Sequence, residues 1–189
     1  MTPADPNPFA PERLADAPFH FSAGTDWETI LARLEAKGWR GAIIGAPGTG
    51  KSILLHQLSR HLEARGLAPR LFSLRTESGA AEKQAVLDAV RTFKAPDFLL
   101  LDGAELLTTK QWLPLHSAAV HCAGCVITIP RSGRLPAIFE TQVTPAAIEA
   151  IVEDLTGGSL PPGEASSLFA RHRGNLRNCL AELHERWAG

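Results

Sequence analysis

The stretch Gly45-Ala46-Pro47-Gly48-Thr49-Gly50-Lys51-Ser52 matches the phosphate-loop pattern Gly-x-x-x-x-Gly-Lys-Ser at every fixed position. An apolar run at 42–44 precedes it and a helical pattern of leucines follows from residue 53, so the loop joins a strand to a helix. Its three glycines let the backbone curl until consecutive N–H groups point at phosphate oxygens, and the following helix adds the positive end of its dipole. The sequence therefore predicts a nucleotide-binding loop at residues 45–52.

Two side chains of this loop have separate expected tasks. Lys51 reaches the β- and γ-phosphates, and the Ser52 hydroxyl ligates Mg²⁺. The guanine-specifying pattern Asn-Lys-x-Asp is absent from the sequence, which favours adenine as the base. We therefore expect ATP and Mg²⁺ as the cofactors.

Composition narrows the class of protein. The 189 residues include 19 Lys and Arg against 20 Asp and Glu, for a formal net charge of −1. This balance gives no overall attraction to nucleic acid, so we expect any contact with nucleic acid to be indirect. No apolar run is long enough to span a bilayer, and residues 1–8 lack the basic and apolar parts of a secretory signal. With only three cysteines, the chain is expected to be cytoplasmic and to have no membrane partner.

Short apolar runs alternate with helical periodicity over the first three quarters of the chain. This alternation predicts a parallel α/β sheet. The predicted strands cover 42–44, 71–74, 98–101 and 125–129, and the predicted helices cover 26–37, 53–65, 80–94 and 109–122, the last bent or shortened by Pro114.

The character of the sequence changes after Val143, where three helices are predicted at 145–155, 163–172 and 175–188. About 45 residues have too little core to fold alone, so we expect them to pack on the sheet as a lid. The expected organisation is a proline-rich arm at 1–18, an α/β domain at 19–143 and a helical lid at 144–189. Phe9, Phe19 and Phe21 are apolar residues through which the arm and the segment after it can pack.

A second nucleotide motif ends the apolar run 98–101. Asp102 stands at the carboxyl end of this strand, where its carboxylate can hold Mg²⁺. The next residue is Gly103, where many such ATPases have glutamate, and the next carboxylate is Glu105. Glu105 is either the group that activates the attacking water or a solvated residue in the first turn of a helix.

Three further polar residues have a functional and an ordinary interpretation. Thr128, within an apolar strand, either senses the γ-phosphate or is simply a good strand former. Arg177 opens the last helix and either crosses to the nucleotide or lies on the surface. Arg131 or Arg134 could act on a neighbouring subunit's nucleotide, although most such arginines are solvated. Zinc binding is disfavoured, because the cysteines near His121 form only one pair.

Together these motifs resemble those of the AAA+ ATPases, particularly bacterial origin-recognition and transposition-helper proteins. The resemblance rests on residues 45–52, on 98–102, on Thr128 as first sensor and on 174–177 as second sensor. It implies a five-stranded parallel sheet in the order 5-1-4-3-2, a helical lid, and a linker that contacts adenine through Phe19, His20 and Phe21. Gly103 departs from the pattern, no arginine finger is located, and no winged-helix DNA-binding domain follows the lid.

Three functions follow from these expectations. The first is a slow Mg²⁺-dependent ATPase with Lys51, Asp102, Glu105, Thr128 and Arg177 in its catalytic machinery, acting as a switch for a protein partner or within a homo-oligomer. The second is a nucleotide-binding interaction module that does not hydrolyse ATP, which Gly103 motivates. The third is a small-molecule kinase, although the sequence offers no acceptor site.

Overall fold

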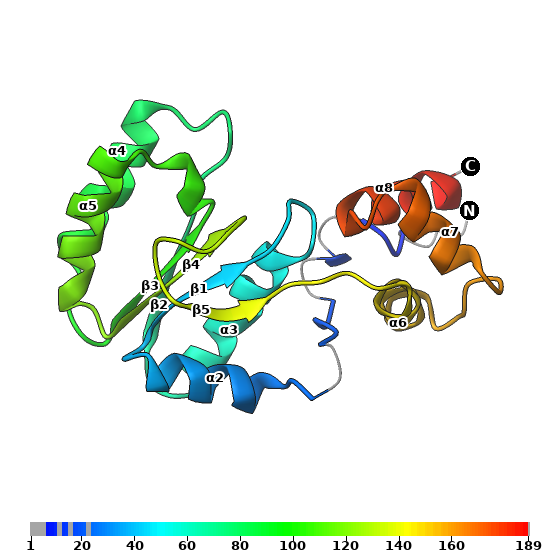
Figure 1. Ribbon diagram of the computed structural model, residues 1–189, viewed down its shortest axis with the longest axis horizontal. Helices are drawn as coiled ribbons and strands as arrows, with labels where there is room; N and C mark the ends of the chain where they lie inside the picture. The colour runs from blue at the N-terminus through cyan, green and yellow to red at the C-terminus, as the bar shows by residue number, and fades with distance from the viewer. Residues whose placement is uncertain (1–6, 11–12, 15–16, 22–23, 189) are drawn as a thin grey trace, which may run out of the picture.

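The computed structural model describes residues 7–10, 13–14, 17–21 and 24–188. A sheet with helices on both faces forms one part of the molecule, and a cluster of three helices forms the other (Figure 1). The expected arm at 1–18 is described only in part, because residues 1–6, 11–12 and 15–16 lie outside these ranges.

The sheet contains five parallel strands in the order β2-β3-β4-β1-β5. This confirms the order 5-1-4-3-2, read from the other edge. The predicted strands 98–101 and 125–129 are buried and, apart from Thr128, apolar, because both of their faces are covered. The strands are β1 (Arg40–Ile44), β2 (Ala68–Ser73), β3 (Asp97–Asp102), β4 (Gly124–Ile129) and β5 (Ala137–Glu140).

Alternate residues of β3 supply two separate cores. Phe98 and Leu100 pack with helices α2 and α3, whereas Leu99 and Leu101 pack with α4 and α5, as the period of two along a strand requires. Figure 1 shows these helix pairs on opposite faces of the sheet. Their bounds are α2 (Trp27–Ala36), α3 (Lys51–Glu63), α4 (Ala80–Val90) and α5 (Thr109–Ala118).

Pro114 lies inside α5, and the α-helix ends four residues later at Ala118. The chain continues as a short 3₁₀ turn, η2 (Ala119–His121), so the predicted helix at 109–122 is present but shortened. A second 3₁₀ turn, η1 (Ala104–Leu106), follows β3 directly.

The C-terminal helical segment, residues 144–188, contains α6 (Pro145–Thr156), α7 (Glu164–Arg171) and α8 (Leu176–Ala188). Its buried core includes Phe9 from the amino-terminal arm, whose residue is only 4% exposed. Phe19 and Phe21 instead pack against Phe139 of the sheet. The arm and the segment directly after it therefore contact both parts of the molecule.

Among the residues that the structure describes, no helix is both long enough and apolar enough to cross a membrane.

Candidate nucleotide-binding site

The loop 45–52 connects β1 to α3, as its position in the sequence predicts. Gly45, Gly48 and Gly50 all have positive φ, a conformation that costs other residues free energy. Gly50 is the residue immediately before α3, so the first turn of this helix points its free N–H groups toward the loop.

Lys51 folds over the backbone of its own loop. Its Nζ donates hydrogen bonds to the carbonyl oxygens of Gly45 (2.7 Å) and Ala46 (2.8 Å). Burial lowers the pKa of Lys51, the nearby carboxylates of Glu105 and Asp102 oppose that change, and the Arg177 guanidinium adds to it. The loop, the end of β3 and the start of α8 thus place four charged groups within electrostatic reach of one another.

A chain of hydrogen bonds joins three elements beside Lys51. The Ser52 hydroxyl donates to Asp102 Oδ2 (2.7 Å), and the Thr128 hydroxyl donates to Asp102 Oδ1 (2.5 Å). Thr128 Oγ1 also accepts from the Gly103 N–H (2.9 Å). Because Thr128 is only 2% exposed, its hydroxyl needs such partners. Thr128 therefore fixes the orientation of the Asp102 carboxylate and of the backbone that follows it.

Gly103 has a structural reason to be glycine. Its φ is +77°, and a Cβ at this position would stand 2.4 Å from the carbonyl oxygen of Leu74. A glutamate at this position would therefore face both strain and a steric clash. Glu105 follows as the exposed residue of the turn η1 and lines an open pocket together with residues 129–134.

The two arginines after β4 have different surroundings. Arg134 stacks over the Trp112 ring, 5.1 Å from its centroid, and donates a hydrogen bond to the Leu107 carbonyl. Its guanidinium is thus directed at its own chain, which disfavours a role in a neighbouring subunit. Arg131 is exposed.

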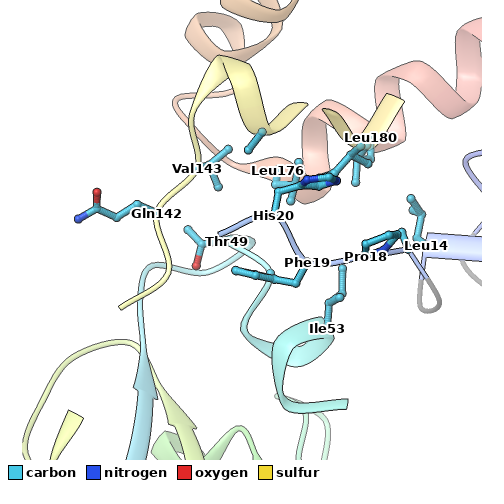
Figure 2. Close-up of a pocket in the computed structure, with 14 residues that line it drawn as sticks. Leu14, Pro18, Phe19, His20, Thr49, Ile53, Gln142, Val143, Leu176 and Leu180 are labelled. Atoms are coloured by element: carbon cyan, nitrogen blue, oxygen red, sulfur yellow. The ribbon is translucent and has the colours of Figure 1, made fainter. Parts of the chain in front are cut away.

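An apolar pocket lies between the loop, the arm and the C-terminal helical segment (Figure 2). The space in it that can hold the centre of a water-sized molecule is small, about 30 Å³, and the pocket opens to solvent. Phe19 and His20 line it, with Thr49 from the loop and Leu176 from α8. Phe21 was expected beside them but does not line this pocket; it packs behind Phe19, with ring centroids 5.0 Å apart, and against Trp27.

Three polar contacts that the sequence did not predict hold the arm and the segment after it over the pocket. Gln57 of α3 accepts the Phe19 N–H (3.2 Å) and donates to the Ala17 carbonyl (2.5 Å). His20 Nε2 lies 2.7 Å from Asp154 Oδ2 on α6. No local sequence pattern marks such residues, because each pair is far apart in the chain.

Arg177 is exposed at the start of α8, and its backbone N–H donates to the Gly48 carbonyl at 3.3 Å. The last helix therefore begins directly on the phosphate loop, and the role of the Arg177 side chain stays a prediction.

The two cysteines near His121 are part of the buried core of the sheet. Cys122 and Cys125 are buried and unpaired with each other, and burial raises the pKa of Cys125 to about 12. Within the described part of the chain, no cluster of three or more His, Cys, Asp or Glu residues is arranged to hold a metal ion.

No protein-family model matches the sequence, and no curated protein matches it. Solved structures do resemble the fold. A Thermotoga maritima RuvB Holliday junction branch migration motor matches with a TM-score of 0.60 and 16% identity, over 90% of this chain and 64% of that one. A replication initiator DnaA bound to AMPPCP and single-stranded DNA matches with a TM-score of 0.57 and 16% identity, over 82% of this chain and 58% of that one.

The chain thus has the AAA+ P-loop fold. It spans about three fifths of the length of these two structures.

Proposed function

We propose that this chain binds ATP with Mg²⁺, hydrolyses it slowly, and acts as a nucleotide-controlled switch for a protein partner or a second copy of itself. The observation that carries this proposal is the hydrogen-bonded chain from Ser52 through Asp102 to Thr128, set beside Lys51. These groups come from α3, β3 and β4, so only the folded sheet brings them together at the phosphate loop.

The residues fit a magnesium ion. Ser52 and Asp102 present a hydroxyl and a carboxylate oxygen 2.7 Å apart, and oxygen ligands of this kind suit Mg²⁺. When bound with ATP, Mg²⁺ neutralises charge that develops on the phosphates. Thr128 contributes by holding the second Asp102 oxygen, so that the carboxylate keeps one orientation.

The pocket lined by Phe19, His20 and Leu176 supports a place for the adenine base. Its apolar walls suit a flat aromatic group, and it adjoins the phosphate loop at Thr49 and Gly50. Because α8 supplies both Leu176 and Arg177, a nucleotide that fills the pocket contacts the C-terminal helical segment and so influences its position. In this proposal that segment acts as the lid.

Arg177 makes the lid sensitive to the γ-phosphate. A ligand shifts a conformational equilibrium only by its differential affinity for the two states. One charge-assisted hydrogen bond from Arg177 to the γ-phosphate contributes about 1.5–3 kcal/mol. That is enough to change lid opening about tenfold or more between ATP and ADP.

A second function, nucleotide binding without turnover, is favoured by Gly103. This position carries no carboxylate, and its backbone conformation and the Leu74 carbonyl disfavour any side chain there. Hydrolysis then depends on Glu105, which is exposed on η1. Single-turnover hydrolysis of ATP separates the two functions, and adding candidate acceptor molecules tests for a kinase.

Hydrogen exchange tests the switch. With AMPPCP, amides of residues 145–188 should be protected more than with ADP, and Arg177→Ala should remove that difference while ADP protection remains. Lys51→Ala should weaken binding of both nucleotides strongly, whereas Lys110→Ala, at an exposed lysine of α5, should not. Equal protection by AMPPCP and ADP in the unmodified chain would rule out the switch, and unchanged affinity in Lys51→Ala would rule out the phosphate-loop assignment.

A further inference from the structure

The first turn of α8 has two backbone N–H groups whose partners lie outside the helix's own ladder. The Asn178 N–H donates to the side chain of Asn175, the residue just before the helix, at 3.2 Å. The Arg177 N–H donates to the Gly48 carbonyl at 3.3 Å. A helix start leaves such donors free, and here one is satisfied by a cap and the other by the phosphate loop.

Asn175 also lies directly against the loop. A Cβ built on Gly48 would stand 2.1 Å from Asn175 Oδ1 and 2.8 Å from its Nδ2. The side-chain amide therefore fills the space that a side chain at position 48 would need. The next residue, Leu176, lies 4.0 Å from the position of a Cβ on Gly50. Residues 175–177 therefore lie along loop residues 48–50.

The hydrogen bond from the Arg177 N–H to the Gly48 carbonyl affects the direction in which the loop points its backbone N–H groups. The Gly48 carbonyl and the Thr49 N–H belong to one planar trans peptide, in which the two groups point in opposite directions. Holding the carbonyl toward α8 thus sets the direction of the Thr49 N–H. Backbone N–H groups of this loop type cradle the phosphates, so the docked helix orients one donor of the cradle.

We propose that Asn175 is a positioning residue that couples the phosphate loop to the C-terminal helical segment. Its amide keeps α8 in register on Gly48, so that phosphate binding at the loop favours docking of the helix and docking favours phosphate binding. Such coupling is reciprocal by thermodynamic necessity. The inference rests on the proposed nucleotide-binding function but concerns a residue that touches no phosphate itself.

Three variants distinguish two roles of Asn175: holding α8 in place on Gly48, and capping the start of α8. Asn175→Ala removes both the cap and the amide that lies on Gly48. Asn175→Ser keeps a good cap but is too short to replace that amide. Asn178→Ala, on the exposed side of the same turn, is the matched control.

The first measurement is hydrogen exchange of the nucleotide-free chain. Asn175→Ala should speed exchange both at residues 177–179 and at loop residues 48–50, whereas Asn175→Ser should restore protection only at 178–179, because the Arg177 N–H is bonded to the loop itself. The second measurement is affinity for AMPPCP and for ADP. The preference for AMPPCP should fall about three- to tenfold in both Asn175 variants, the loss expected for one hydrogen bond, and stay unchanged in Asn178→Ala.

Two results would overturn the inference. If Asn175→Ser behaves like the unmodified chain in both measurements, Asn175 is only a cap. If Asn175→Ala changes exchange in α8 but not in the loop, the two elements are not coupled through it. Failure of the unmodified chain to bind either nucleotide would instead remove the proposed function, and loop exchange in the nucleotide-free chain would still decide the coupling.

Discussion

Replacing Gly103 with alanine should destabilise the fold by more than its backbone conformation alone explains. Gly103 has φ of +77°, and the added Cβ would meet the Leu74 carbonyl oxygen at 2.4 Å. Leu74 cannot retreat freely, because its N–H donates to the Asp102 carbonyl at 2.9 Å and so continues the pairing of β2 with β3. The clash is therefore with backbone that the sheet itself holds.

The magnitude has two parts. A side chain in the left-handed region costs about 1–2 kcal/mol, and forcing extra volume into a packed position costs about 1–3 kcal/mol more. Gly66 provides the control, since its φ of +76° is nearly the same and a Cβ there would meet nothing within 4 Å. Gly103→Ala should thus lose about 2–5 kcal/mol and Gly66→Ala about 1–2 kcal/mol.

Urea unfolding of the two variants and the unmodified chain measures both losses. Equal losses would refute the reasoning, because they would mean that the end of β3 relaxes without cost. Gly103→Glu provides a second test of the same reasoning. It should be destabilised at least as much as Gly103→Ala and should hydrolyse ATP no faster, whereas a stable, faster variant would show that a glutamate fits this position after all.

Three other substitutions test the remaining assignments. Asp102→Asn should weaken the Mg²⁺ dependence of nucleotide binding, because the amide keeps the shape but loses the charge; titration with and without Mg²⁺ checks this, and an unchanged dependence would leave Asp102 as a strand terminus. Glu105→Gln should abolish hydrolysis and preserve ATP binding, since an amide cannot take a proton; unaltered single-turnover rates would assign the base elsewhere. Phe9→Ala should cost about 3–5 kcal/mol and reduce protection of α6–α8 in hydrogen exchange, whereas Leu113→Ala, at a residue 58% exposed, should cost little; matched losses would contradict the packing of the arm.

The sequence predicted those parts of the sheet whose burial is uniform. β3 and β4 are covered on both faces, so their residues form continuous apolar runs with clear ends. β2 begins at Ala68, earlier than the predicted 71, because it is an edge strand and Pro69 is tolerated there. β5 was implied only by the family resemblance, because its four residues are few and their burial does not alternate, so they do not distinguish a strand from a loop.

In the candidate site, too, the sequence predicted some residues and not others. Lys51, Ser52 and Asp102 belong to local patterns whose spacing carries their chemistry, and the structure brings them together. Gln57 contacts residues far from it in the chain, and only the folded arrangement identifies it. Asn175 lies within the predicted motif 174–177, but its contact with Gly48 is visible only in the fold. Phe21 does not line the apolar pocket, because a linker's sequence does not indicate which of two nearby aromatic rings turns inward, and its expected contact with adenine stays a prediction.

Comparison of the forces on the C-terminal helical segment indicates which contact can act as its switch. The contact of His20 with Asp154 joins side chains that are 28% and 36% exposed, and even charged pairs at such exposure contribute only about 0–1 kcal/mol. A nucleotide that binds only the docked form contributes about 2.7 kcal/mol at 100 times its Kd. Burial of Phe9 contributes about 1.5–3 kcal/mol whether or not nucleotide is present, so it keeps the arm on the helical segment without favouring either state. In the proposed switch, occupancy of the phosphate loop therefore has a larger influence on docking than the contact of His20 with Asp154, and a partner that competed for this surface would have to work against the bound nucleotide.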